Sequence, residues 1–217
     1  MKLHCNTAEV GDNMAGIEIG VDDAELEKIY EALKKYPKKA ERAIIRTKND
    51  TAQRTLTPMK ELISSRYNIA KNKLTGGSEY AGESSNNLIK AIKTNSINLD
   101  SAIRARGGYL TLHRFVKGNK QPRNKKGKGY VNVQVKKGNS VEMGNTTFIQ
   151  HDPKSNHPQV FQRRSNSRTI RRLLKTTSVA HMLSNENIAP KVQESALEIM
   201  KKRAEHYLER ELKSIKK

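Results

Sequence analysis

The strongest structural signal in the sequence is a helical pattern of apolar residues that begins at Asn187 and continues to the C-terminus. One broad face carries Val192, Ala196, Ile199, Arg203, Tyr207 and Leu212, joined by Leu197, Met200, Ala204, Leu208 and Ile215. Lysine and glutamate fill the other positions, and this spacing predicts one amphipathic helix of about 25–30 residues, roughly 40 Å long at 1.5 Å per residue. We expect its apolar face to form core or a subunit interface. The glutamates of the helix disfavour an anionic membrane surface.

Two further helices are predicted near the N-terminus. Asp22 or Asp23 is a suitable N-cap, because a carboxylate accepts free backbone N–H bonds there. Helical spacing then places four side chains on one face of a helix that ends near Tyr36: Leu26, Ile29, Tyr30 and Leu33. Pro37 is suited to the first position of the next helix, since its missing N–H is not needed there.

That second helix is predicted to reach about Leu56, with Ala40, Ala43, Ile44 and Thr47 on its apolar face. Pro58 is expected to kink or divide it before the helix resumes, because proline lacks the donor of an internal helical bond. A third short helix is predicted over about 68–74, closing at Gly76-Gly77.

Short apolar or alternating runs in the middle of the chain predict an antiparallel sheet. They cover 88–97, 101–106, 109–116, 130–136, 146–150 and 158–164. The clearest run places Val131, Val133 and Val135 on one face. Gly107-Gly108 suggests a turn between two strands, Met14–Val21 an edge strand, and Thr177–Leu183 a short helix.

These elements predict an α+β fold with N-terminal helices, a central basic antiparallel β-sheet with a long hairpin loop, and a long C-terminal helix. We expect residues 1–36 to form an arm of one strand and one amphipathic helix. Residues 37–217 are expected to form a single domain, with helices over 37–75, the sheet over 87–164 and C-terminal helices over 177–217. The core must be modest, because 35% of the residues are hydrophobic and the chain has no tryptophan and three phenylalanines.

Positive charge is concentrated in the middle of the chain. The formal net charge is +20, and the segment from Ser101 to Asn185 holds 18 Lys or Arg against two acids, Glu142 and Asp152. The rest of the chain holds 24 Lys or Arg against 20 acids and is nearly balanced. The partner of the middle segment should therefore be polyanionic or rich in acidic residues.

Within this segment, Lys117–Gly129 contains six basic residues and no apolar side chain. Such a sequence cannot offset its ordering entropy by burial, so we expect a mobile hairpin loop in the free protein. Its candidate docking residues, for a protein partner or DNA, are Lys117, Lys120, Arg123, Lys125, Lys126 and Lys128. A second candidate interface consists of Arg163, Arg164, Arg171 and Arg172. The loop lacks interleaved aromatic residues for base stacking, so phosphate neutralisation is the expected mode of any nucleic-acid contact.

No catalytic or cofactor-binding motif is recognisable. The sequence lacks a nucleophile elbow, a phosphate-cradling Gly-Lys-Ser/Thr loop, a dinucleotide-binding glycine pattern and a His-Glu-x-x-His motif. We therefore predict no catalytic residue, no cofactor and no metal. His151, Asp152 and His157 are the best potential metal cluster, but their spacing is not that of a closed zinc site, and a polar loop containing Pro153 and Pro158 is the alternative.

The start of the chain and its single cysteine bear on where the protein is made. No run approaches the roughly 18 apolar residues needed to cross a bilayer, and Met1–Cys5 is followed by polar residues. Cys5 alone cannot form an internal disulfide. We expect a protein made in a reducing cytoplasm and not inserted into a membrane.

Several stretches resemble the prophage minor tail protein Z family of phage tail-completion proteins. Arg42-Ala-Ile-Ile-Arg-Thr and Tyr67-Asn-Ile-Ala are similar to its helical half, and Tyr109-Leu-Thr-Leu-His-Arg-Phe115 to a strand with a Leu-x-x-Phe pattern. Val160-Phe-Gln-Arg-Arg164, then Ile170, Leu173 and Ser178–Leu183, resemble a Val-Phe-x-Arg segment and a following helix start. The resemblance covers about 38–215. The chain departs from the pattern at Thr169 and at Thr176-Thr177, where the family tends to have a proline and Gly-Pro.

The resemblance implies a non-enzymatic virion protein, a tail-completion or neck component at the head–tail junction that is made in the host cytoplasm. It implies a homo-oligomer, expected to be a hexameric ring, that contacts the tail terminator, tail tube or connector and non-specifically the genomic DNA. The alternative from the residues alone is a nucleic-acid-binding protein that uses the basic middle region. A nuclease that uses His151, Asp152 and His157 is a third, poorly supported hypothesis.

Overall fold

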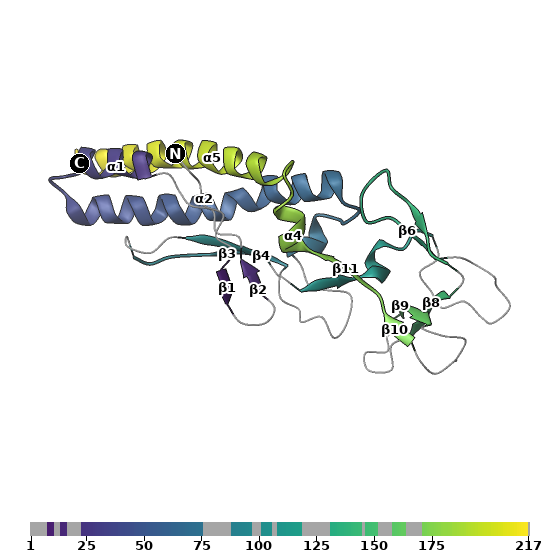
Figure 1. The fold of residues 1–217 in the computed structure, drawn as a ribbon. Helices are drawn as coiled ribbons and strands as arrows, with labels where there is room; N and C mark the ends of the chain where they lie inside the picture. Colours follow the sequence, from purple (N-terminus) through teal and green to yellow (C-terminus); the bar gives the residue numbers. More distant parts are fainter. Residues whose placement is uncertain are drawn as a thin grey trace.

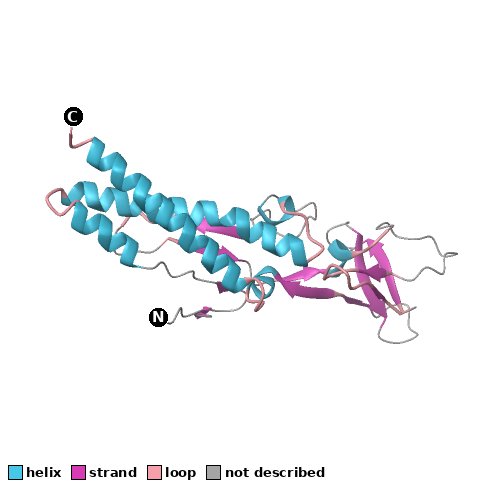
Figure 2. Cartoon of the chain, turned by 90° about the horizontal axis from the view of Figure 1, so that it is seen from above, coloured by secondary structure: helices cyan, strands magenta, loops and turns pink. Residues whose placement is uncertain are grey.

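The protein is elongated, with a helical end and an end built of short strands (Figures 1 and 2). The computed structural model describes residues 8–10, 14–16, 23–75, 88–96, 101–105, 108–118, 131–144, 146–151, 158–163 and 171–216. The fold is α+β, as predicted. None of the described helices combines the length and apolar character that crossing a bilayer requires.

Three helices form the helical end. The described helices are α1 (Asp23–Ala32), α2 (Pro37–Arg66), α3 (Asn72–Thr75), α4 (Val179–Leu183) and α5 (Ala189–Lys213), with a 3-10 helix η1 (Leu112–Phe115). The long helices α2 and α5 lie side by side along most of their length, and α1 packs against both (Figure 1). The prediction of the long C-terminal helix is confirmed, as is Pro37 at the start of α2.

The second helix was predicted to reach about Leu56 and to be kinked or divided at Pro58. It is not divided, because α2 continues through Pro58 to Arg66. The missing N–H and the ring of an internal proline cost a helix about 3 kcal/mol. Apolar residues on both sides of Pro58 are fully packed, with Leu56, Met59 and Ile63 all buried. Burial of each such side chain contributes about 1.5–3 kcal/mol, which is enough to offset the proline.

The strands form small antiparallel sheets instead of the single central sheet that was predicted. They are β1 (Ala8–Val10), β2 (Met14–Gly16), β3 (Ile89–Ile92), β4 (Ala102–Ala105), β5 (Tyr109–Thr111), β6 (Asn132–Val133), β7 (Val141–Glu142), β8 (Thr147–His151), β9 (Pro158–Arg163), β10 (Arg171–Leu173) and β11 (Lys175–Ser178). Among the described residues, β10–β9–β8 forms a three-stranded sheet, and the pairs are β1–β2, β3–β4, β5–β11 and β6–β7. Alternation located most of these strands, but strands of two to six residues do not reveal their partners.

Several boundaries differ from the predictions. The third helix begins at Asn72 instead of Asn68, and the strand expected over 109–116 ends at Thr111, where η1 takes over. Thr177 and Ser178 belong to β11 instead of to the helix that follows. In the run of alternating valines, Val131 and Val133 are buried and Val135 packs partly against the core, as predicted. The proposed turns at Gly76-Gly77 and Gly107, and residues 17–21 of the edge strand, lie outside the described residues.

The β3–β4 hairpin is fixed to α2 by hydrogen bonds between side chains and backbone groups. The Asn49 side-chain amide donates to the backbone oxygen of Thr94 at 2.7 Å, and the Thr94 N–H donates to Asn49 Oδ1, also at 2.7 Å. The Ser101 hydroxyl donates to the backbone oxygen of Lys48 at 2.7 Å. The two ends of the connection between β3 and β4 are therefore tied to one turn of α2.

Two apolar clusters hold the described part of the chain together. The larger joins the C-terminal half of α2 to the short strands, α4 and the start of α5, with Phe115, Ile63 and Met182 fully buried. The smaller joins α1, the start of α2 and the end of α5. Leu26, Ile29 and Leu33 of α1 are buried there as predicted, but Tyr30 is 51% exposed and does not share their buried face.

Candidate docking surface

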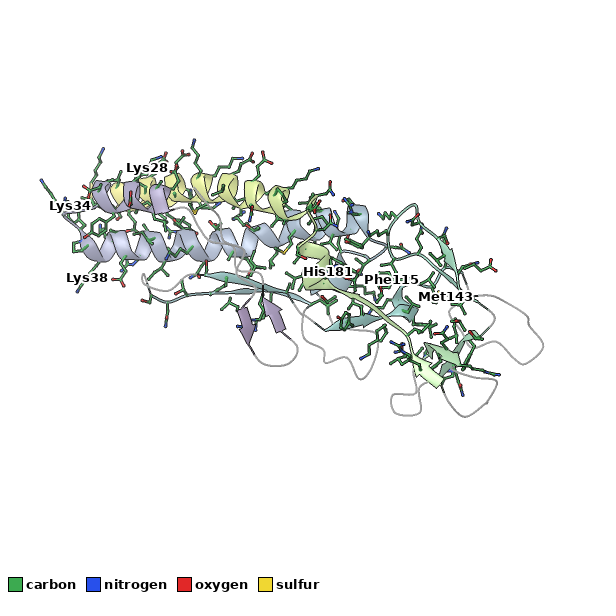
Figure 3. The ribbon with its side chains drawn as sticks, viewed as in Figure 1. Lys28, Lys34, Lys38, Phe115, Met143 and His181 are labelled. Carbon is green, nitrogen blue, oxygen red and sulfur yellow. The ribbon has the colours of Figure 1, made fainter. Side chains whose placement is uncertain are left out.

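The base of the predicted basic loop is a short antiparallel pairing. The backbone N–H of Lys117 donates to the oxygen of Asn132 at 2.8 Å, that of Gln134 donates to Phe115 at 2.8 Å, and Val116 bridges Val133. Phe115 anchors this base because its side chain is fully buried in the main core, against which Met143 is also packed (both labelled in Figure 3). This antiparallel pairing of the flanking residues agrees with the predicted hairpin, while the loop itself, over 119–130, lies outside the described residues.

Of the six predicted docking residues in the loop, the structure describes Lys117, which is exposed. Gly118 follows it with φ of 80°, a backbone conformation that glycine adopts without strain. The other five, Lys120, Arg123, Lys125, Lys126 and Lys128, lie outside the described residues.

The second predicted interface is assembled by the pairing of β9 with β10. Arg163 stands opposite Arg171 in the register, and Arg172 stands opposite Gln162. The side chains of Arg163 and Arg172 are exposed, and Arg164 lies outside the described residues. Three of the four predicted arginines are thus brought to one end of the three-stranded sheet, although seven residues of sequence separate β9 from β10.

Arg163 rests on an aromatic side chain that sequence reasoning did not assign to the site. Its guanidinium carbon lies 5.1 Å from the ring centroid of Phe148 on β8, and Phe148 in turn stacks with Phe161, with the centroids 6.1 Å apart. Phe148 pairs with Phe161 in the register, so Arg163 reaches it diagonally across the ladder. The sequence signal was weak, because a diagonal contact requires the register to be known.

Two exposed lysines, Lys136 and Lys137, were also missed. Lys136 forms an antiparallel β-bridge with Tyr67, the residue after α2. The backbone N–H of Lys137 donates to the backbone oxygen of Arg66 at 2.8 Å, and both lysines are exposed. Both follow the alternating valines, and the strand predicted over 130–136 ends at Lys136. They extend the basic region to the junction between α2 and the sheet end.

Charge is distributed differently at the helical end, where acids and bases are interleaved and paired. Asp50 on α2 receives Arg54 Nε at 3.0 Å, Arg203 Nε at 3.5 Å and the Tyr207 hydroxyl at 3.5 Å, the last two from α5. Lys28, Lys34 and Lys38 lie at the free end of the helices, and the first two pair with glutamates of α1 (Figure 3). The surface charge of this end is therefore largely compensated.

A partly buried ion pair also joins α2 to α5. Glu211 is 4% exposed and lies 3.3 Å from Arg46 Nη1. The helical pattern predicted an apolar residue on this face, with Leu212 inside, but Leu212 is 38% exposed and Glu211 is buried. Leu197, also placed on that face, is 38% exposed. The buried stripe of α5 follows four-residue spacing from Val192 through Ala196, Met200 and Ala204. Glu211 lies on the same stripe, where Arg46 pairs with its carboxylate.

A surface pair closes the turn after α2. Lys71 Nζ donates to Glu61 Oε1 at 2.8 Å. This hydrogen bond and the lysine charge hold the pKa of Glu61 below its usual value. Both side chains are more than half exposed, so solvent screens the pair and it contributes little to stability.

The residues singled out for metal binding are not assembled in the described part of the chain. His151 is exposed at the end of β8, while Asp152 and His157 lie outside the described residues. Within the described ranges, no group of three or more His, Cys, Asp or Glu residues is placed to hold a metal ion.

Comparison with known proteins does not place the chain in a family. No family model, curated protein or solved structure matches it. The assignment of function therefore rests on the residues and on their arrangement. The end built of short strands is cationic, and the charges of the adjoining helices are largely compensated.

Proposed function

We propose that this chain is a structural subunit of a tailed-phage particle, a tail-completion or neck component at the head–tail junction that acts by assembly and without turnover. It would form a ring, expected to be hexameric, and dock to the tail terminator, tail tube or connector. The observation that carries the proposal is the segregation of charge: 18 Lys or Arg against two acids between Ser101 and Asn185, beside helices whose charges are interleaved.

The architecture supports docking by the sheet end. The base of the basic loop is fixed to the main core by Phe115 and by the pairing of residues 115–117 with 132–134. The stems therefore fix where the basic loop leaves and rejoins the folded part of the chain. Its partner can order it on binding, as happens with many charged segments that lack apolar residues.

The test is replacement of residues 118–128 in the phage genome by a Gly/Ser linker of equal length. We expect a folded protein and particles with incomplete or unjoined tails, scored by plaque titre and electron microscopy. The matched control replaces the exposed α5 residues Lys201 and Lys202 with glutamine and should leave the titre unchanged. Wild-type titre for the loop variant would refute the role of the loop, and absence of the chain from finished particles would refute the proposal as a whole.

A nucleic-acid-binding protein is the alternative, in which the basic region is the whole function and no particle is built. Exposed Arg163 and Arg172 on paired strands favour it as much as they favour docking to a protein. Mass spectrometry of purified particles separates the two hypotheses, because only a structural subunit persists at a fixed ratio to the other particle proteins.

A further inference from the structure

We infer that the outer part of the helical end, which we call the arm, opens as a cooperative unit of its own while the rest of the protein stays folded. The arm consists of α1, residues 37–46 of α2, and residues 204–216 at the end of α5 and just after it. These segments lie together at one end of the molecule (Figure 1). The inference concerns a conformational property of the fold and holds whether or not the chain belongs to a phage particle.

The apolar core is divided along the two long helices. On α2, the smaller cluster ends at Ile44 and the larger cluster begins at Ala52. On α5, the larger cluster includes Val192 and the smaller cluster includes Ala204. Proteins open in contiguous units, and a part with few buried apolar contacts opens at a lower free energy than the main core. The arm, which contains the smaller cluster, is such a part.

Between the two clusters, α2 carries a layer of buried polar side chains: Thr47, Lys48 and Thr51. Thr47 and Thr51 continue the buried stripe from Ala43 at four-residue spacing. The structure gives neither threonine hydroxyl a hydrogen-bond partner. A buried hydroxyl without a partner has lost its hydration and gained no bond in exchange, so the closed state is penalised at this level of the helix. When the arm opens as far as this layer, water reaches the hydroxyls and the penalty is relieved.

The contacts within the arm are weak for its size. Three of the seven buried residues of the smaller cluster are alanines, and three more come from one face of α1. Polar contacts supply the rest of the hold between α2 and α5, with Arg46 Nη1 3.3 Å from Glu211 Oε1 and Lys39 Nζ 2.9 Å from Ser214 Oγ. Both cations remain partly in contact with solvent, which competes for these bonds. The arm should therefore open more often than the main core.

The test is native-state hydrogen exchange of the full chain, followed by mass spectrometry at urea concentrations below the unfolding transition. Peptides from α1 and from residues 37–46 should exchange through an opening at least about tenfold more frequent than the one that exposes residues 56–66. Its urea dependence should be weaker, because a partial opening exposes less surface. Protection along α2 should rise in one step across residues 47–51. A gradual rise, as expected of fraying from the free end, would overturn the inference, and so would equal opening frequency and urea dependence in the arm and the main core.

A valine variant tests the layer itself. T47V/T51V removes both unpartnered hydroxyls from the closed state and should lower the opening frequency of the arm at least about tenfold. The matched control, T57V, makes the same chemical change at an exposed position of α2 and should leave that frequency within about twofold of wild type. No change in T47V/T51V, or an equal change in T57V, would overturn the role given to the layer.

Circular dichroism before exchange checks that each variant is folded. The step in protection is measured on the wild-type chain, so the inference can be refuted even if the valine variant does not fold. None of these readouts depends on plaque titre, so their outcome is distinct from that of the proposed function.

Discussion

Glu211 is a charge in an otherwise apolar stripe of α5, and its carboxylate pairs with Arg46 of α2 at 3.3 Å. The two side chains differ in environment, since the Glu211 side chain is buried and the Arg46 side chain is 39% exposed. If the pair is broken, Arg46 can turn into solvent, whereas Glu211 stays buried without a partner. Removal of the arginine should therefore cost more stability than replacement of the glutamate.

We predict that Arg46→Ala lowers the free energy of unfolding by about 2 kcal/mol, below the 3–5 kcal/mol of a fully buried pair because Arg46 is partly exposed. Glu211→Leu should cost less than about 1 kcal/mol, because it replaces a buried charge with an apolar side chain. Urea denaturation followed by circular dichroism measures both. Equal losses in the two variants would contradict this asymmetry, and the double variant should restore most of the stability lost in Arg46→Ala.

Among the helices and strands, α2 shows how packing overrides local preference. Its apolar pattern and its start at Pro37 were predicted from the sequence, but its extent as one undivided helix to Arg66 was not. Local reasoning gives the cost of the proline and cannot give the burial of Leu56, Met59 and Ile63, which depends on the strands and helices around them. The same limit applies to β11, whose residues Lys175–Ser178 show no alternation and pair with β5 from a distant part of the sequence.

We predict that Pro58→Ala stabilises the protein by about 1–2 kcal/mol. Alanine restores the helical bond and removes the ring clash, worth about 3 kcal/mol, and part of this gain is lost because the unfolded chain becomes more flexible. Thermal and urea denaturation measure the change. Gln53→Ala, on an exposed position of the same helix, is the control and should have an effect within about 0.5 kcal/mol. Destabilisation by Pro58→Ala would mean that α2 depends on the proline.

For the molecule as a whole, fold class and the location of positive charge followed from composition and periodicity. The candidate docking surface could be predicted from the sequence only in part. Runs of basic residues located Lys117 and the arginines of β9 and β10, because basic residues can be identified without knowing how the strands pair. The contact of Arg163 with Phe148 and the opposition of Arg163 and Arg171 depend on strand pairing, which a three-residue strand such as β10 does not encode by itself.

We predict that the melting temperature of the free protein rises with added KCl. Screening weakens the repulsion among the 18 cations of the sheet region, since the Debye length falls from about 30 Å at 0.01 M to about 8 Å at 0.15 M. The surface ion pairs of the helices lose less, because each is worth only about 0–1 kcal/mol. Differential scanning calorimetry should show an increase of a few degrees, about 2–4 °C per kcal/mol for a chain of this size.

A neutral osmolyte at matched osmolality is the control for this measurement, because it changes hydration without screening charge. A melting temperature that falls with KCl would show that the ion pairs of the helices outweigh the repulsion at the sheet end.

The bridge between Val116 and Val133 has a consequence for how this protein can diverge. The two stems are held by backbone bonds and by a buried ring, so their pairing does not depend on the number of residues that join them. Each doubling of a flexible loop adds only about 0.6 kcal/mol of closure entropy. Insertions, epitope tags or binding peptides grafted at this point should be tolerated, and related chains can exchange targets there while the rest of the molecule stays the same.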